Sequence, residues 1–320
     1  MSAPLPPHGP PSRSRSGLVL LGGPTASGKS EVAVALAELL DGEIVSVDSM
    51  QVYRGLDIGT AKPPAGVRAR VPHHLMDVVD LSEPFDAARF VVLARRAVAE
   101  IHGRGRVAIL CGGTGLYFRA FLAGLGEAPP PDPELRAELE ATPLEELLRE
   151  LQARDPATYE RIDRRNPRRV VRAVEVIRLT GKPFSVQRAD WREPPPEPVH
   201  VLRRAPEDLR RRIDARVDQM FAAGLVEETQ RLLARGLEQN RTAMQALGYR
   251  QVVEHLRGHR SLPETIELVK RRTWQFARRQ LTWFRRQPNV EWLDVSPQEP
   301  AAAIATRLAA RARANHGSTP

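Results

Sequence analysis

The sequence predicts an α/β fold in which helices flank a parallel β-sheet, extended by a helical insertion and by C-terminal helices. Two observations carry this prediction. Short apolar runs, typical of strands that are buried on both faces, alternate with longer segments of helical periodicity. A glycine-containing turn follows the first apolar run directly and opens a helical segment, which is the strand–turn–helix order of a parallel α/β sheet.

The first half of the chain supplies the beginning of this sheet. Residues 1–16 are rich in Pro, Ser and Arg and contain little that could be buried, so we expect a disordered tail there. Asp41 and Gly42 end the first helix. The elements expected after the tail are a strand at 17–21, a helix at 30–40, a strand at 43–47, a helix at 87–102 and a strand at 107–111.

The composition changes after residue 123. Two proline clusters, at 129–133 and 194–196, bracket a stretch with helical patterns and no buried strand. Because proline clusters form stiff, non-helical joints, we expect a helical insertion between two parts of the core. The expected boundaries are 17–123 for the first part of the core, 124–197 for the insertion, 198–296 for the rest of the core, with strands at 199–202 and 290–294 around helices within 207–287, and 297–320 for a C-terminal tail.

The composition is that of a soluble globular chain. Its 320 residues include 48 Lys and Arg against 39 Asp and Glu, a formal net charge of +9. No apolar run approaches the roughly 18 residues that span a bilayer, and the N-terminus lacks the apolar core of a signal peptide. The single cysteine, Cys111, excludes an intramolecular disulfide framework and a multi-cysteine zinc site. We therefore expect a reduced, cytoplasmic, globular chain without a membrane segment. We also expect it to be a monomer, although the sequence leaves the oligomeric state open.

Arginine supplies 44 of the 48 cations, and it is dense in residues 161–178 and 270–286. Such density favours binding to a polyanion, although solvated helix faces have the same composition. In the second segment Trp274, Arg278, Leu281 and Arg285 share one helix face by their spacing. This pattern fits either a buried core stripe or contact with a nucleic-acid backbone.

The strongest local signal is the string GPTASGKS at residues 23–30, which fits the phosphate-binding loop (P-loop) pattern G-x-x-x-x-G-K-[ST]. Glycines allow successive backbone N–H groups to converge on phosphate oxygens at a helix N-terminus. Lys29 adds a positive charge, and the Ser30 hydroxyl can hold Mg²⁺. The loop predicts a pyrophosphate-bearing ligand, by default a nucleoside triphosphate such as ATP; a glycine-rich turn without a ligand is the structural alternative.

Two further polar residues follow predicted strands. Asp48 comes directly after the strand at 43–47, and Thr114 follows the strand at 107–111 through two glycines. Because ligands gather at the carboxyl ends of parallel strands, both side chains are expected near the phosphate loop. Asp48 could hold Mg²⁺ or accept a proton, and Thr114 could hydrogen-bond a phosphate oxygen. A helix or turn cap is the alternative role for Asp48.

Two other polar segments are less informative. His73 and His74, with Asp77 nearby, suggest a metal site, but adjacent side chains on an extended segment diverge, so we interpret them as loop histidines. Residues 57–63 form a polar loop with the rare lysine Lys62; it could line a site or be only a turn.

Taken in order, these motifs resemble the tRNA dimethylallyltransferase (tRNA isopentenyltransferase) family over roughly residues 17–295. The phosphate loop is followed by six further strings, which make the resemblance specific. They are VDSMQVYRGLDIGTAKP at 47–63, GGTGLY at 112–117, NPRRVVRAVE at 166–175, RIDARVDQM at 212–220, ALGYR at 246–250 and ARRQLTWF at 277–284.

The resemblance implies a P-loop core with a helical insertion, and transfer of the dimethylallyl group of dimethylallyl diphosphate to N6 of the adenosine 3′-adjacent to the anticodon of tRNA. It implies Asp48 as general base for the adenine amine, and Thr114 near the bridging oxygen of the leaving group. Mg²⁺ and Arg216 are implied to hold the diphosphate together with Gly23, Pro24, Thr25, Ala26, Ser27, Gly28, Lys29 and Ser30. Contacts to the tRNA anticodon arm are implied for Asp48, Ser49, Met50, Gln51, Thr114, Arg136, Arg168, Arg169, Val170, Val171, Arg172, Gln245, Gly248, Tyr249, Arg250, Arg278, Arg279 and Gln280.

Two other functions use part of the same features. A small-molecule or nucleoside kinase would use the phosphate loop for ATP, but it gives no role to the basic insertion or the aromatic–arginine helix. An RNA-binding module with a vestigial phosphate loop leaves the intact Lys29, Ser30, Asp48 and Thr114 unexplained.

Overall fold

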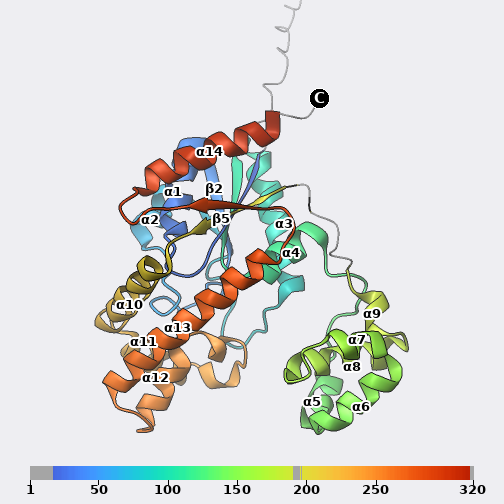
Figure 1. Ribbon diagram of the computed structural model, residues 1–320. Coiled ribbons are helices and arrows are strands. Elements are labelled where there is room, and N and C mark those ends of the chain that lie inside the picture. Colours follow the sequence, from blue (N-terminus) through green and yellow to red (C-terminus); the bar gives the residue numbers. More distant parts are fainter. Residues whose placement is uncertain (1–16, 190–194, 196, 318–320) are drawn as a thin grey trace, which may run out of the picture. The chain divides into compact units, whose positions relative to one another are not determined.

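The five predicted strands and one further short strand form one six-stranded sheet in the computed structural model (Figure 1). The strand order is β3-β2-β4-β1-β5-β6, and every neighbouring pair is parallel. The predicted parallel α/β fold is therefore confirmed. The strands are β1 (Leu18–Gly22), β2 (Gly42–Val47), β3 (His73–His74), β4 (Val107–Gly112), β5 (Val199–Arg203) and β6 (Val290–Asp294).

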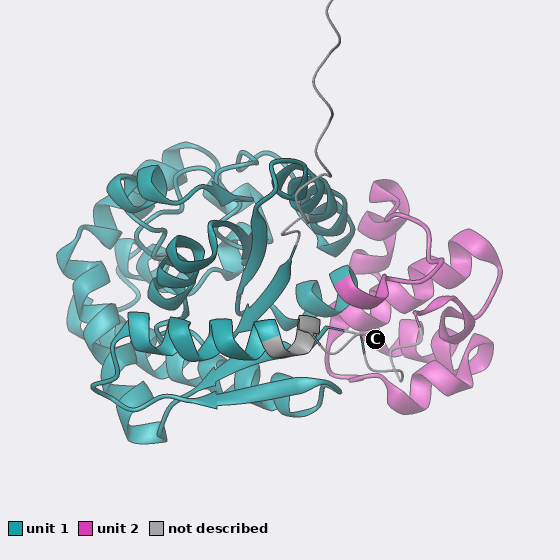
Figure 2. Ribbon diagram, turned by 90° about the horizontal axis from the view of Figure 1, so that it is seen from above, with its two compact units in different colours: residues 1–121, 194–320 teal, residues 122–193 magenta. Residues whose placement is uncertain are grey.

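The structure describes residues 17–189, 195 and 197–317, and the chain divides into two compact units (Figure 2). Unit 1 comprises Met1–Phe121 and Pro194–Pro320, and unit 2 is Leu122–Glu193. Unit 2 overlaps the helical insertion expected at 124–197. The tail expected at residues 1–16 lies outside the described residues.

Helices cover both faces of the sheet in unit 1. The apolar core on one face joins the strands to α1 (Lys29–Leu40) and α14 (Ala301–Gly317) through residues such as Leu36 and Leu308. The other face carries α3 (Ala87–Gly103) and α4 (Gly115–Ala123), where Phe90 stacks on Tyr117 at 4.4 Å between ring centroids (Figure 1). Burial on both faces explains why the central strands β1 and β4 are nearly continuous apolar runs.

Two sequence predictions need correction here. The tail expected at 297–320 is wrong for most of its length, because α14 packs on α1 through a stripe of Ile304, Ala305, Leu308 and Ala309. His73 and His74 are not loop residues but form the short strand β3 beside β2. Within the described residues no three potential ligands cluster to hold a metal ion, so the structure gives no support to a metal site there.

Two of the remaining helices of unit 1, α10 (Pro206–Ala222) and α13 (Leu262–Arg285), pack against the phosphate loop. Ile213 and Leu209 of α10 and Ala277 of α13 form a small buried cluster with Ala26 of that loop. A capping box of Ser261 and Glu264 begins α13. The helices, with two 3₁₀ turns, are α2 (Ala65–Arg70), α10 (Pro206–Ala222), α11 (Leu225–Ala234), η1 (Leu237–Gln239), η2 (Ala243–Gln245), α12 (Tyr249–Leu256) and α13 (Leu262–Arg285).

Unit 2 is built from helices around its own core. Leu139, Leu147, Leu151 and Val174 are fully buried in it. Three of its helices begin with an Asp or Asn cap followed directly by proline, a strong start signal. The helices are α5 (Pro133–Ala141), α6 (Leu144–Arg154), α7 (Pro156–Arg161), α8 (Pro167–Thr180) and α9 (Phe184–Gln187). Among the described residues, no helix has the length and apolar character to cross a bilayer.

Candidate active site

The phosphate loop connects β1 to α1 and has the backbone geometry that its sequence predicts. Ala26 and Gly28 adopt positive φ angles of 62° and 91°, and α1 starts at Lys29. Its N-terminal N–H groups, which have no partner within a helix, therefore face the end of the sheet. The buried Ser27 hydroxyl has no hydrogen-bond partner among the described residues. An orphaned donor at this position suits an oxygen-rich ligand.

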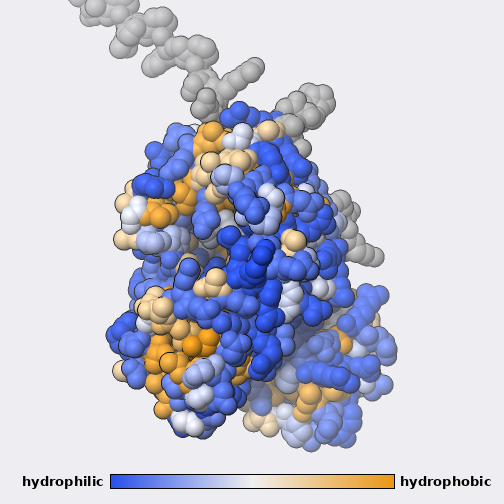
Figure 3. Space-filling view, turned by 60° about the vertical axis from the view of Figure 1, so that its left-hand side comes forward, coloured by the Kyte–Doolittle hydropathy of each residue, from blue (hydrophilic) through white to orange (hydrophobic). Residues whose placement is uncertain are grey.

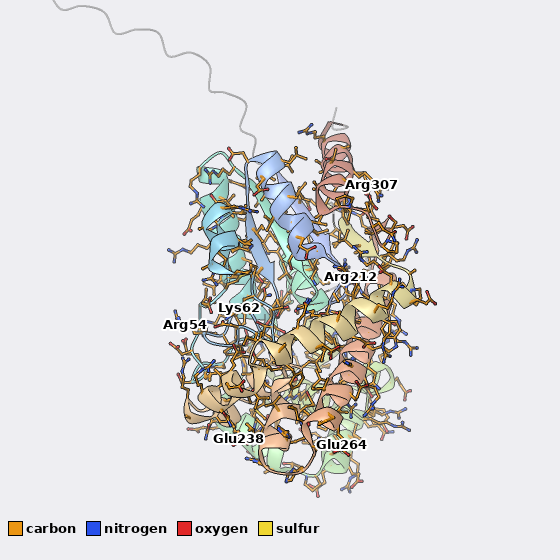
Figure 4. All side chains as sticks on the ribbon, turned by 90° about the vertical axis from the view of Figure 1, so that its left-hand side faces the viewer. Arg54, Lys62, Arg212, Glu238, Glu264 and Arg307 are labelled. Carbon is orange, nitrogen blue, oxygen red and sulfur yellow. The ribbon has the colours of Figure 1, made fainter. Side chains whose placement is uncertain are left out.

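Two arginines hold this loop from outside. Arg204 Nε donates to the Ser27 carbonyl at 2.8 Å, and Arg212 Nε donates to the Ala26 carbonyl at 2.9 Å. Arg204 is itself buried and paired with Asp208 at 2.9 Å. In Figure 4, Arg212 extends from α10 toward the start of α1. These two hydrogen bonds fix the backbone of the loop through its carbonyl groups.

The loops that follow β2 and β4 are bound to each other. Asp48 Oδ1 accepts hydrogen bonds from the amides of Met50 at 2.8 Å and Gln51 at 3.3 Å, so the alternative role as a turn cap is also real. Thr114 Oγ1 accepts from Ser49 N at 3.2 Å, and Thr114 N donates to the Val47 carbonyl at 3.2 Å. Asp48 and Thr114 are thereby fixed at the same edge of the sheet.

These loops enclose a cavity of about 370 Å³. Its polar lining includes Lys29, Ser30, Asp48, Thr114 and Arg216. Its wall also contains apolar and aromatic side chains, among them Ala33, Ile44, Val217, Val269 and Phe276. One cavity thus combines cations, one carboxylate and an apolar surface, as expected for a ligand with a charged end and a hydrocarbon end.

Burial shapes the electrostatics of this cavity. It lowers the pKa of Lys29, with Cys111 and Asp48 opposing the shift and Arg216 reinforcing it. Burial also lowers the pKa of Arg216, against the attraction of Asp48. Two partly desolvated cations facing one carboxylate leave an excess of positive charge, which favours an anionic ligand.

Two larger cavities adjoin this one. A cavity of about 770 Å³ shares Lys29, Ser30, Pro63 and Arg216 with it, and another of about 970 Å³ shares Gln245 and Leu247. Each larger cavity therefore shares part of its wall with the central one.

The polar loop at 57–63 both lines the cavity and is held as a turn. Gly59, Thr60 and Pro63 contribute to the wall. The Lys62 side chain is only 4% exposed and donates to Asp57 at 2.7 Å and to Asp77 at 2.5 Å. Lys62 thus fixes the shape of the segment that follows Asp48.

Gln51 and Tyr249, which are among the residues implied to contact tRNA, form hydrogen bonds inside the fold. Gln51 is 9% exposed, accepts from Ser46 Oγ at 2.8 Å and donates to the Thr60 carbonyl at 3.1 Å. Tyr249 is fully buried, and its hydroxyl donates to Glu228 at 2.6 Å. The structure gives both side chains a positioning role. Of the other residues in unit 1 implied to contact tRNA, the cavity is lined by Asp48, Ser49, Met50, Thr114, Gln245, Arg279 and Gln280, whereas Gly248, Arg250 and Arg278 lie outside its lining.

In unit 2 the implied tRNA contacts separate into two groups. Arg168 and Arg169 are exposed in the first turn of α8. Arg136 and Arg172 instead each bind the buried Glu175 at 2.6 Å. Val170 and Val171 are buried in the core of the unit, so their side chains are not available to a ligand. Arg168 and Arg169 are therefore the best placed of these residues to contact RNA.

The fold and the site define a P-loop enzyme that handles a phosphorylated ligand: a phosphate loop, a carboxylate and a hydroxyl meet where parallel strands end. A family model described as IPP transferase matches residues 51–287, and one described as isopentenyl transferase matches residues 16–70. The chain belongs to the IPP transferase family.

Curated relatives and solved structures agree with this assignment. "tRNA dimethylallyltransferase 1" of Citrifermentans bemidjiense is 47% identical over 283 residues, covering 87% of this chain and 92% of the relative. The tRNA dimethylallyltransferase of Thermomicrobium roseum is 48% identical over 289 residues, 88% and 87% of the two chains. The tRNA isopentenylpyrophosphate transferase of Bacillus halodurans matches with a TM-score of 0.69 at 40% identity, over 94% of this chain and 98% of that one. A eukaryotic dimethylallyltransferase described as acting on tRNA matches with a TM-score of 0.78 at 27% identity, over 95% and 80%.

Proposed function

We propose that this enzyme transfers the dimethylallyl group of dimethylallyl diphosphate to N6 of the adenosine 3′-adjacent to the anticodon in tRNA. The products are N6-dimethylallyladenosine and diphosphate. The observation that carries the proposal is that the phosphate loop and Asp48 line one cavity. The relatives named for this reaction cover most of the chain and support it.

The chemistry fits the charges of that cavity. An allylic carbon–oxygen bond breaks readily once the departing diphosphate is neutralised, because the positive charge that develops on carbon is delocalised. Lys29, Arg216 and the loop amides are the groups that would stabilise the leaving diphosphate. Thr114 would lie near its bridging oxygen. The apolar wall would hold the hydrocarbon and exclude water.

Asp48 would act on the other reactant. The exocyclic amine of adenine is a weak nucleophile, and it loses a proton as its bond to carbon forms. A carboxylate at the strand end can accept that proton. Asp48 Oδ1 is occupied by two backbone amides, so Oδ2 is the oxygen we assign to this step.

The donors of the site fit Mg²⁺ bound together with the diphosphate. The site offers the Ser30 hydroxyl and one carboxylate, and Mg²⁺ in proteins is commonly held by few protein oxygens together with substrate phosphates. When bound, it would supply further positive charge to the leaving group. Ser30 is the residue that would hold it.

The basic surface supports the second substrate. The net charge of +9 and the exposed arginines 168, 169, 278 and 279 suit a polyanion, and hydrophilic residues cover most of the face in Figure 3. The target adenine must leave its stack to enter a cavity of about 370 Å³, as RNA loop bases do when proteins modify them. We propose that the protein acts on tRNA in the cytoplasm, as a monomer.

One assay separates the candidate functions. Purified protein is incubated with unmodified tRNA and either dimethylallyl diphosphate labelled in the prenyl group or ATP labelled in its γ-phosphate. Label entering tRNA from the prenyl donor alone supports the proposal. Phosphate transfer from ATP to an acceptor would establish a kinase instead, and tRNA retention without transfer from either donor would indicate a binding protein.

A further inference from the structure

Gln280 connects two catalytic loops that are far apart in the sequence. It lies on α13 and is only 7% exposed. Its Oε1 accepts a hydrogen bond from the amide of Thr25 at 2.9 Å, and its Nε2 donates to the carbonyl of Gly113 at 2.9 Å. Both ends of one buried carboxamide are thus satisfied by backbone groups, one in each loop.

The ladder between β1 and β4 does not extend into the two loops. Hydrogen bonding between β1 and β4 ends at the pair Gly22 and Gly112, so the residues beyond are outside the ladder. A Cβ atom on Gly113 would lie 2.2 Å from Gln280 Nε2, and side chains cannot approach so closely. Glycine at position 113 therefore allows Gln280 to reach the chain.

These links extend to the carboxylate. Gly113 precedes Thr114, whose Oγ1 accepts from Ser49 N, and Ser49 follows Asp48. A continuous set of short contacts therefore runs from the phosphate loop through Gln280 to the loop of Asp48. Gln280 also occupies the Thr25 amide, which is then unavailable to a ligand.

We infer that Gln280 is a positioning residue that fixes the phosphate loop relative to Thr114 and Asp48. This inference rests on the proposed function, in which the first loop holds the leaving diphosphate and Asp48 serves the incoming amine. The rate of transfer depends on the separation of those groups, and a displacement of about 1 Å is enough to cost about 100-fold. The resemblance implied a tRNA contact for Gln280, which predicts a different phenotype.

The test replaces Gln280 with Met, which keeps the length of the side chain but forms neither hydrogen bond. Gln275 on the same helix is exposed and lines none of the cavities described above, so Gln275→Met is the matched control. We expect Gln280→Met to lower kcat at saturating substrates by about 10- to 100-fold. The Kd for unmodified tRNA and for inorganic diphosphate should stay within about threefold of the wild type. Gln275→Met should match the wild type in all three measurements.

A rise in the tRNA Kd with an unchanged kcat would overturn the inference and restore the RNA-contact role. If Gln280→Met does not fold, Gln280→Glu serves, because it can still accept from Thr25 but loses the donor to Gly113. We expect kcat to fall at least about tenfold in that variant, and an unchanged kcat would overturn the inference.

Failure of the proposed function has a different signature. If the wild type transfers no prenyl group, the reaction is wrong, and Gln280 is then judged by hydrogen exchange at the Thr25 amide. Exchange at least about tenfold faster in Gln280→Met than in the wild type would support the positioning role. Equal protection in the two proteins would overturn it.

Discussion

Replacing Asp48 by Asn isolates the proton-accepting oxygen from the rest of the site. Asp48 Oδ1 accepts from the amides of Met50 and Gln51, and an asparagine oxygen can keep both hydrogen bonds. The loop therefore stays in place while the basic oxygen becomes an amide nitrogen. Loss of a positioned general base costs about 10²- to 10⁴-fold, which corresponds to about 3–5 kcal/mol of barrier.

The assay is single-turnover transfer of labelled prenyl group to tRNA at saturating enzyme. We expect the rate to fall about 10³-fold. The affinity for inorganic diphosphate should be unchanged or slightly higher, because the substitution removes a negative charge from a cavity with Lys29 and Arg216. Asp48→Ala, which also removes both loop hydrogen bonds, should be slower still. A rate for Asp48→Asn within about threefold of the wild type would refute the role of Asp48 as base.

Three further predictions concern stability and RNA binding. Glu228→Ala should cost about 4 kcal/mol of unfolding free energy, measured by urea denaturation, because the buried carboxylate accepts from Ile58 N, Gly59 N and the Tyr249 hydroxyl. Arg169→Ala should weaken tRNA binding in a filter assay by about tenfold and leave the KM for the prenyl donor unchanged. Burial alone would raise the pKa of Glu43, but hydrogen bonds from Arg104 and His74 lower it from 4.5 to about 2. The wild type should therefore be more stable than Glu43→Gln by a constant free energy of unfolding above pH 4.5. That difference should shrink as the pH falls toward 2, because the carboxylate becomes protonated.

Each of these predictions has a matched control. The controls change exposed residues: Glu227→Ala is compared with Glu228→Ala, Arg149→Ala with Arg169→Ala, and Glu38→Gln with Glu43→Gln. Equal stability losses for Glu227→Ala and Glu228→Ala would show that the hydrogen bonds of Glu228 contribute little. Equal tRNA affinity for Arg149→Ala and Arg169→Ala would remove the specific role of α8. A Glu43→Gln difference that is constant from pH 6 to pH 2.5 would contradict the ion-pair account.

The features of the fold and the site that could be predicted from the sequence are those that depend on local residue patterns. Continuous apolar runs indicated five of the six strands, and the rule that ligands gather at strand ends brought Asp48 and Thr114 to the phosphate loop. The strand His73–His74 was missed because two polar residues carry no strand periodicity. Helix α14 was missed because alanine and arginine give little contrast between its buried and exposed faces.

Contacts between segments that lie far apart along the chain could not be predicted from the sequence. Arg204 and Arg212 are two of 44 arginines, and their bonds to the phosphate loop span 177 and 186 residues. Gln280 reaches Thr25 across 255 residues. Composition and spacing cannot reveal such pairs, because only the folded chain decides which of many chemically similar side chains approaches which carbonyl or amide.

A crystal structure with a tRNA anticodon stem-loop and an unreactive thio analogue of dimethylallyl diphosphate would show whether the phosphate loop and Asp48 serve the two reactants in one cavity. We expect the analogue's diphosphate to contact Lys29, Arg216 and the amides at the start of α1. We expect N6 of the adenine 3′ of the anticodon to lie within hydrogen-bonding distance of Asp48 Oδ2. A diphosphate bound away from that loop, or an adenine that remains stacked outside the cavity, would contradict these expectations.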